Sequence, residues 1–258
     1  MFPASVSGWG SLYVCLGEGR AGLFRQLCGG SVSWPIWSAD RSSIGRQRQF
    51  LSRCIPVFFC GIHPVMAKLY FNYSTMNAGK STVLLQASHN YIERGMQTYL
   101  LTAQFDNRAG KGTIKSRIGI GCAADTFAPG EDLFAKIAMR LDQGPVACVF
   151  IDEAQFLEPD QVWQLARAVD DLGVPIMCFG LRVDFQGGLF PGSAALLALS
   201  DEMREVRTIC HCGKKATMVI RKDANGKVTR VGAQVQIGGN ETYVSLCRRH
   251  WREAVGDT

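Results

Sequence analysis

The stretch that decides the fold is Ser74-Thr75-Met76-Asn77-Ala78-Gly79-Lys80-Ser81, which lies between an expected strand and an expected helix. A phosphate-binding loop directs backbone N–H groups at its ligand from a helix N-terminus, and it adds a Lys for the phosphates and a hydroxyl for Mg²⁺. Gly79, Lys80 and Ser81 fit these roles. The usual pattern has Gly where this chain has Ser74, so for the loop alone a chance Gly-Lys-Ser helix start remains an alternative.

A second segment supports the phosphate loop. Residues 149–151 form an apolar run that ends in two carboxylates, Asp152 and Glu153. In nucleotide-binding α/β folds this position faces the phosphates across the carboxyl edge of the sheet. We expect Asp152 to hold Mg²⁺ and Glu153 to act beside the reacting centre as a base or water-positioning group. The alternative role is helix capping, since Pro159 follows six residues later.

Strand-like and helix-like segments alternate around these two motifs. The strands are expected at residues 68–73, 97–103, 146–151 and 174–181, and the helices at 79–95, 132–141 and 159–172. The first helix has Val83, Leu84 and Ala87 as its apolar positions. Continuous apolar strands that alternate with helices predict an α/β fold, a doubly wound parallel sheet of the P-loop, RecA-like kind.

The chain divides by composition into three expected parts. Residues 1–65 contain six Arg, two acidic residues and no Lys, and the texture changes at Met66. We interpret them as a disordered extension or a start assigned too far upstream, with an anchor, targeting or regulatory arm as the alternative. Residues 66–206 are expected to form the nucleotide-binding α/β domain. Residues 207–258, rich in short β segments, are expected to form a small zinc-binding domain.

Two short-spaced pairs of metal-type ligands lie in that last part. Cys210-x-Cys212 and Cys247-x-x-His250 are separated by 34 residues. This spacing predicts a structural Zn²⁺ site, closed to water, with three thiolates and one imidazole. His211 could compete as a ligand, and the Cys residues could simply pack. The basic residues nearby are expected to form a solvated face: Lys214, Lys215, Arg221 and Lys222.

Composition and charge argue against several classes of protein. The formal net charge is +6, but residues 1–65 supply about +4 of it, so the remaining chain has no evident basic patch for nucleic acid. No secretion signal is recognisable, and the apolar run 54–66 is too short and interrupted to span a bilayer. We therefore expect a cytoplasmic protein with reduced thiols and no membrane partner. Three single Cys residues are expected to be buried small hydrophobes: Cys122, Cys148 and Cys178.

The order of these motifs resembles the type II thymidine kinase family. The resemblance rests on the phosphate loop, Asp152-Glu153-Ala154-Gln155 and the trailing ligand cluster, and it runs from about Met66 to the C-terminus. It is closest to the enterobacterial-type members. Three further segments support it: Asp106-Asn107-Arg108, Gly180-Leu181-Arg182-Val183-Asp184-Phe185, and Ile237-Gly238-Gly239-Asn240 with Tyr243.

The resemblance implies a reaction and a set of site residues. The expected reaction moves the γ-phosphate of ATP to the 5′-hydroxyl of thymidine or deoxyuridine, with Mg²⁺, Glu153 as base and a structural Zn²⁺. Residues 74–81, Asp152 and Gln155 would bind ATP and Mg²⁺. Asp106 and Arg108 would lie near the transferred phosphate, and Phe185 and Phe190 would wall the base pocket. A "lasso" would grip thymine through its main chain, braced by Tyr243: Gln236, Ile237, Gly238, Gly239 and Asn240. A homotetramer is also implied.

Three alternative functions remain at this point. A helicase needs a second ATPase lobe, and too few residues follow Leu181 to form one. A zinc-ribbon module that binds nucleic acid is opposed by the intact Lys80, Ser81, Asp152 and Glu153 and by the near-neutral charge after residue 65. A kinase for another deoxynucleoside is the nearest competitor, because residue types do not reveal pocket geometry.

Overall fold

The computed structural model describes residues 67–105, 110, 112–223, 225–232, 234 and 242–256. The chain separates into two compact units, Met1–His63 and Pro64–Thr258, and everything below concerns the second. The predictions for residues 1–65, for Asp106 and Arg108, and for residues 236–240 lie outside the described residues. The division of the second unit at residue 207 stays a prediction.

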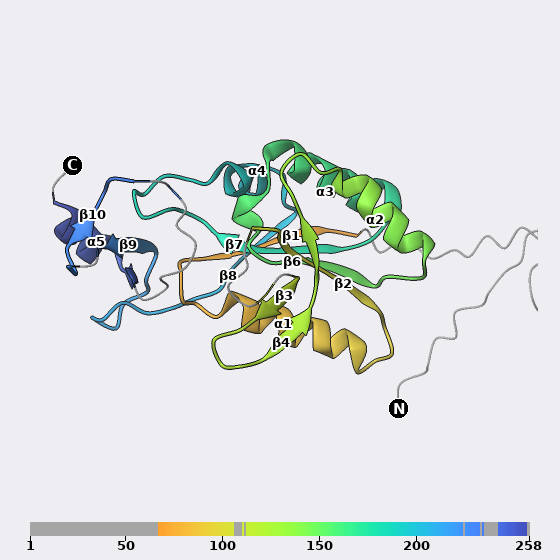
Figure 1. Cartoon of the computed structure of the whole chain (residues 1–258), viewed down its shortest axis with the longest axis horizontal. Coiled ribbons are helices and arrows are strands. Elements are labelled where there is room, and N and C mark those ends of the chain that lie inside the picture. The colour runs from red at the N-terminus through yellow and green to blue at the C-terminus, as the bar shows by residue number, and fades with distance from the viewer. Residues whose placement is uncertain are drawn as a thin grey trace, which may run out of the picture. The chain divides into compact units, whose positions relative to one another are not determined.

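A parallel sheet of six strands forms the centre of this unit (Figure 1). Its order is β5-β2-β6-β7-β1-β8, and every neighbouring pair runs parallel. The strands are β1 (Leu69–Ser74), β2 (Thr98–Ala103), β5 (Asp125–Phe127), β6 (Cys148–Ile151), β7 (Ile176–Leu181) and β8 (Glu202–Glu205). This confirms the predicted α/β class. Because β7 lies between β1 and β6, the phosphate loop and the carboxylate pair leave the same edge of the sheet one strand apart.

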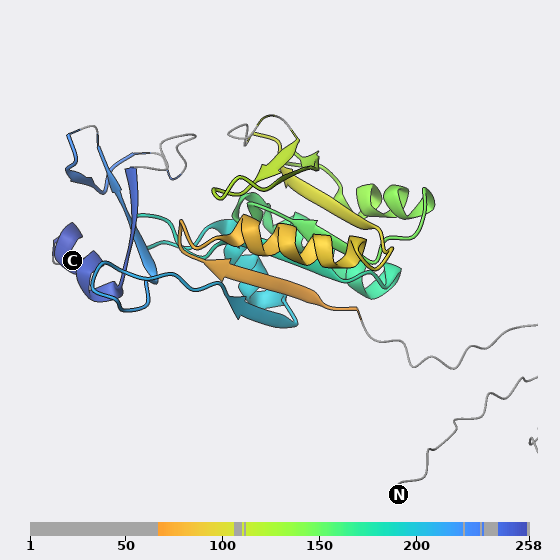
Figure 2. The same ribbon diagram turned by 90° about the horizontal axis from the view of Figure 1, so that it is seen from below.

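Helices cover both faces of the sheet, as Figures 1 and 2 show. Helix α1 (Lys80–Ile92) lies on one face, and α2 (Leu133–Asp142), α3 (Pro159–Leu172) and α4 (Pro191–Leu199) lie on the other. Successive residues of a strand point to opposite faces. In β6, Phe150 accordingly packs with Leu84 of α1, while Ile151 packs with Leu165 of α3. The continuous apolar runs seen in the sequence are explained by this double cover.

Two expectations about burial are wrong in part. Val83 is 43% exposed, and Leu85 takes its place beside Leu84 in the core, because the sheet-facing stripe of α1 runs through Leu84, Leu85 and Ser88. Cys148 and Cys178 are buried as expected, but Cys122 is exposed. It lies on β4 (Gly121–Ala123), which pairs with β3 (Thr113–Lys115) in a two-stranded hairpin, and all three β4 residues are exposed.

A small β-rich lobe follows the central sheet. Strands β9 (Met218–Lys222), β10 (Val228–Thr229) and β11 (Tyr243–Leu246) form an antiparallel sheet in the order β10-β9-β11, and α5 (Arg248–Val255) packs against it. Its core is small: Cys210, Ala216, Ile220, Leu246 and Cys247. Among the described helices, none combines the length and the apolar character needed to cross a membrane.

Candidate active site

The phosphate loop joins β1 to α1 through two residues in the left-handed conformation. Asn77 has φ 64° and Gly79 has φ 84°, and Gly adopts such a turn without steric cost. Helix α1 begins at the next residue, Lys80, whose buried Nζ donates to the carbonyl of Thr75 at 3.3 Å. The Ser74 hydroxyl, at the position where the pattern has Gly, donates to the same carbonyl at 2.7 Å. The loop therefore accommodates Ser74 through an internal hydrogen bond.

Ser81 and Asp152 bring two oxygen ligands together. The Ser81 Oγ donates to Asp152 Oδ2 at 2.8 Å, although 71 residues separate them in sequence. Burial, and then the neighbouring Glu153 carboxylate, raise the pKa of Asp152 to about 7. Oxygen ligands at the mouth of a phosphate loop are those that Mg²⁺ prefers, and a divalent cation favours the ionised form of such a carboxylate. The pair therefore fits a Mg²⁺ site.

Glu153 is held in an unusual backbone conformation beside this pair. Its φ of 53° is left-handed, which is uncommon for a residue with a side chain and often accompanies function. Gln155 Nε2 donates to Glu153 Oε2, and Gln155 Oε1 accepts from the backbone N–H of Leu181 at 2.9 Å. A Cβ at Gly180 would lie 2.9 Å from the Gln155 backbone nitrogen, so that position has room only for Gly. Gln155, expected among the ATP and Mg²⁺ ligands, is thus placed where it orients Glu153.

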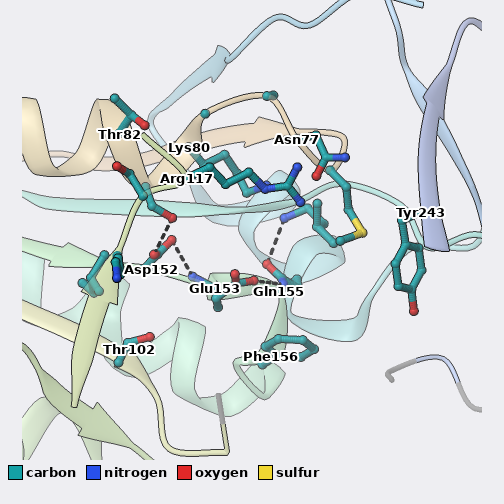
Figure 3. A pocket seen from close by; sticks show the side chains of 18 of the residues that line it. Asn77, Lys80, Thr82, Thr102, Arg117, Asp152, Glu153, Gln155, Phe156 and Tyr243 are labelled. Atoms are coloured by element: carbon teal, nitrogen blue, oxygen red, sulfur yellow. Dashed lines mark hydrogen bonds between the residues drawn. The ribbon is translucent and has the colours of Figure 1, made fainter. Parts of the chain in front are cut away.

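These residues line one cavity of about 450 Å³ (Figure 3). It also reaches the aromatic residues expected at the base pocket and the lobe residue Tyr243. The expected site residues that line it are Met76, Asn77, Ala78, Gly79, Lys80, Ser81, Asp152, Glu153, Gln155, Phe185, Phe190 and Tyr243. Ser74 and Thr75 are buried and do not line it. The structure therefore brings the phosphate loop and the expected nucleoside wall into a single chamber.

The chamber contains an aromatic residue that was not among the predicted site residues. Phe156 lines the cavity, and its ring makes edge contacts with Phe105 at 4.5 Å and Phe190 at 6.1 Å between centroids. Phe156 directly follows the Asp152–Gln155 segment, and this position was the one sequence feature that could have indicated its place in the site. Edge-to-face is a preferred packing of aromatic rings and adds about 0.5–1.5 kcal/mol for each pair beyond the burial of area. Three rings thus line or support the cavity beside the carboxylates.

A hydrogen bond between Asp184 and Gln234, neither of which was a predicted site residue, connects the lobe to the cavity wall. Asp184 is buried, accepts from the backbone of Gln186 and Gly188, and accepts from Gln234 Nε2 at 2.8 Å. Gln234 itself lines the cavity. The chain that leads toward residues 236–240 is therefore anchored to the loop that carries Phe185.

Arg221 corrects the expectation of a solvated basic face. It is only 6% exposed, and its guanidinium lies 3.9 Å from the ring centroid of Phe185. Its Nη2 donates to the carbonyl of Val231 at 2.7 Å. Arg221 lies directly opposite Tyr243 of β11 in the lobe sheet, and residues opposite each other share one face of a sheet. The Arg221 side chain therefore lies on the same face as Tyr243, which lines the cavity. The sequence could not distinguish this buried cation from its exposed neighbours.

The four predicted metal ligands converge in the lobe. Their ligand atoms all lie within 4.8 Å of one another. Zn–S bonds of about 2.3 Å and Zn–N bonds of about 2.0 Å imply tetrahedron edges of roughly 3.5–3.8 Å. The separations are 3.9 Å for Cys212 Sγ to Cys247 Sγ, and 3.3 and 3.5 Å from His250 Nδ1 to Cys210 Sγ and Cys247 Sγ. The cluster therefore fits zinc. Cys212 is exposed, so the cluster lies at the surface of the lobe.

Phosphoryl transfer is the chemistry that this chamber can support. A lysine and a helix N-terminus are groups that can bind phosphates, two oxygen ligands can hold a divalent cation, and an oriented carboxylate lies beside aromatic side chains. The fold and the site thus define a P-loop phosphotransferase.

Comparison with known proteins identifies the family. The thymidine kinase family model matches residues 67–251. The chain is 78% identical over 192 residues to a thymidine kinase of Ruegeria pomeroyi, covering 74% of this chain and 97% of that protein. It is 74% identical over 192 residues to one of Jannaschia sp. (74% and 98% covered) and 55% identical over 191 residues to one of Idiomarina loihiensis (74% and 99% covered). The chain belongs to the thymidine kinase family.

Proposed function

We propose that the protein transfers the γ-phosphate of ATP to the 5′-hydroxyl of thymidine, and of deoxyuridine, to give the 5′-monophosphate for DNA synthesis. The observation that carries this proposal is the shared chamber. It joins a phosphate loop and an oriented carboxylate to an aromatic wall, in a chain that belongs to the thymidine kinase family.

The phosphate end of the reaction is assigned to the loop and its partner strand. Lys80 and the N-terminus of α1 bind the β- and γ-phosphates. Ser81 and Asp152 would hold Mg²⁺, which when bound neutralises charge on the phosphate oxygens. Glu153 accepts the proton of the substrate 5′-hydroxyl as that oxygen attacks phosphorus. Gln155 keeps the Glu153 carboxylate in place during this step.

The nucleoside end is assigned to aromatic side chains and to the lobe. Phe156, Phe185 and Phe190 would wall the base pocket, and Tyr243 would brace the lasso of residues 236–240. Asp106 and Arg108 are proposed near the transferred phosphate. Backbone groups of a lasso would read the polar edge of thymine, and a hydrogen-bonding site rejects mismatched analogues strongly. We therefore propose that deoxycytidine, whose 4-amino group reverses one donor–acceptor pair, is a poor substrate.

The Cys and His cluster is proposed to hold a structural Zn²⁺. Three thiolates and one imidazole complete a tetrahedron and leave no position for a substrate or a water. Its role would be to stabilise the small lobe that carries Tyr243.

The remaining proposals concern location and assembly. We propose a cytoplasmic homotetramer without nucleic-acid or membrane partners, as the family resemblance and the near-neutral charge after residue 65 suggest. Analytical ultracentrifugation of the full chain tests the assembly, and a dimer or a monomer would contradict it.

The experiment that tests the reaction is a nucleoside panel. Purified protein is supplied with ATP, Mg²⁺ and thymidine, deoxyuridine, deoxycytidine or a purine deoxynucleoside, and kcat/KM is measured for each. Thymidine and deoxyuridine should exceed deoxycytidine by up to about 10⁴-fold. If deoxycytidine or a purine nucleoside is phosphorylated as well as thymidine, the protein is a kinase for another deoxynucleoside.

A further inference from the structure

The β3–β4 hairpin forms part of the active-site wall. Six consecutive residues, 113–118, line the cavity that also contains Lys80 and Asp152. The hairpin is anchored at its root, where Ile114 is 2% exposed and packs in the same cluster as Leu84 and Leu85 of α1. Its tip is closed by two backbone hydrogen bonds, from Ser116 N to Ile120 O at 2.7 Å and from Gly119 N to Ser116 O at 3.1 Å. The backbone of the tip is therefore held in a defined turn at the cavity.

Arg117 is the cationic residue of this tip. It is exposed, lines the cavity, and forms no hydrogen bond or ion pair with any residue in the described part of the chain. Figure 3 shows its side chain among those that line the cavity. The acidic groups that line the same cavity, Asp152, Glu153 and Asp184, are engaged instead with Ser81, Gln155 and Gln234. Its guanidinium is therefore available to an anionic ligand in the chamber.

Ser116 supplies an independent observation that points to a ligand. Its side chain is 5% exposed, and its Oγ is buried without a hydrogen-bond partner among the described residues. Buried hydroxyl groups in folded proteins almost always have a partner. Because Ser116 lines the cavity beside Arg117, a bound anion can provide that partner.

We propose that Arg117 is a further catalytic residue, which the hairpin tip supplies to the γ-phosphoryl group, with Ser116 as an additional hydrogen-bond donor. In the reaction, the bond from the 5′-oxygen to the γ-phosphorus forms as the bond from that phosphorus to the β–γ bridging oxygen breaks. The hydroxyl proton passes to Glu153, and ADP leaves. Negative charge grows on the transferring group and on the bridging oxygen. The planar guanidinium donates two parallel N–H groups to phosphate oxygens, which the single ammonium of Lys80 cannot do.

This inference rests on the proposed kinase reaction, so its test includes a measurement that needs no turnover. Arg117→Gln and Arg117→Lys are compared with the unaltered protein and with Arg94→Gln, which removes an exposed arginine outside the cavity. We expect kcat to fall at least about 10²-fold in Arg117→Gln, with KM for thymidine changed less than about threefold. Arg117→Lys should have a higher kcat than Arg117→Gln, because lysine keeps the positive charge but lacks the two parallel N–H groups of the guanidinium. In Ser116→Ala, kcat should fall roughly 3- to 10-fold, because one hydrogen-bond donor is lost.

Binding of ATP and ADP, measured by calorimetry with Mg²⁺, distinguishes this proposal from the function on which it rests. Contact with the γ-phosphate predicts that Arg117→Gln weakens ATP binding more than ADP binding, whereas Arg94→Gln changes neither. This holds even if the nucleoside panel shows that thymidine is not the substrate. An unchanged ratio of ATP to ADP affinity, or a kcat loss that only accompanies a lower melting temperature, would overturn the role of Arg117.

Discussion

Glu153 occupies a left-handed backbone conformation at the end of β6, and Gln155 fixes its carboxylate through a hydrogen bond. Replacing Glu153 by Gln keeps the shape of the side chain and removes its ability to accept a proton. We expect kcat to fall roughly 10²–10⁴-fold in Glu153→Gln, because general-base catalysis contributes about that factor. ATP affinity should be retained, since the phosphate loop is unaltered. Near-full turnover in this variant would remove Glu153 from the chemistry.

A second residue-scale prediction concerns Arg221, which packs on Phe185 and bonds the carbonyl of Val231. A Cβ at Gly232 would lie 2.5 Å from Arg221 Nη2, so the chain passes close against this guanidinium. Arg221→Met should raise KM for thymidine roughly 3- to 30-fold, which corresponds to a cation–π contact of about 0.5–2 kcal/mol. KM for ATP should not change.

Lys222→Gln on the same strand is the matched control for Arg221, because Lys222 is the next residue and is only half-buried, whereas Arg221 is buried against the ring of Phe185. Equal values of KM for thymidine in Arg221→Met and Lys222→Gln would show that Arg221 does not position the nucleoside wall.

Local patterns predicted some residues of the site and could not predict others. Lys80, Ser81 and Asp152 were recognisable because their roles follow from contiguous motifs at strand and helix ends. Arg117 and Arg221 carried no such signal. The role of each depends on which way a short strand or turn directs the side chain, and that is decided by tertiary packing. Asp106, Arg108 and residues 236–240 remain predictions.

At the scale of elements, the sequence predicted four of the six strands of the parallel sheet, β1, β2, β6 and β7, because these strands are covered on both faces and are therefore largely apolar. The edge strands β5 and β8 were missed, because both are short and partly exposed. The β3–β4 hairpin was missed: its strands are three residues each, and β4 is exposed throughout, so it has no periodic apolar signal. The lobe was predicted from its ligand pairs rather than from its strands. Its small core contains two of those ligands, Cys210 and Cys247.

The lobe also supports the cavity, which leads to a prediction about metal removal. Ser245 Oγ donates to the carbonyl of Met76 in the phosphate loop at 2.6 Å, and Tyr243 of the same strand lines the cavity. Because the core of the lobe is small, we expect its stability to depend on the proposed Zn²⁺. Cys247→Ser should therefore abolish zinc binding and lower the melting temperature by several degrees. KM for thymidine should rise more than kcat falls, because Cys247 lies outside the cavity lining.

Elemental analysis of the purified protein should find about one Zn²⁺ per chain. Cys122→Ser is the control, because it removes an exposed thiol outside the cluster and should leave zinc content unchanged. Active protein without metal would contradict the zinc site.

At the scale of the whole molecule, the first strand of the second compact unit, β1, finds its hydrogen-bond and ion-pair partners within that unit. The backbone N–H of Leu69 donates to Asp201 Oδ2 at 2.7 Å, and Lys68 pairs with Glu202 at 2.7 Å, so β1 is anchored by residues within the unit. The thymidine kinase family model matches residues 67–251, and 192 residues of this chain cover 97% of the Ruegeria pomeroyi protein. The family's fold and site are thus contained in residues that follow Met66.

A shortened chain that starts at Met66 should therefore match the full chain in kcat/KM for thymidine and in melting temperature. A change of 1 kcal/mol in the free energy of unfolding shifts the melting temperature of a unit of this size by about 2–4 °C, so even a modest stabilising contact from residues 1–65 would be detected. Both chains are compared at equal concentration by calorimetry and by the thymidine assay, with zinc content measured in parallel. A lower melting temperature or a marked loss of turnover in the shortened chain would mean that residues 1–65 pack on the kinase, since the two chains differ in nothing else.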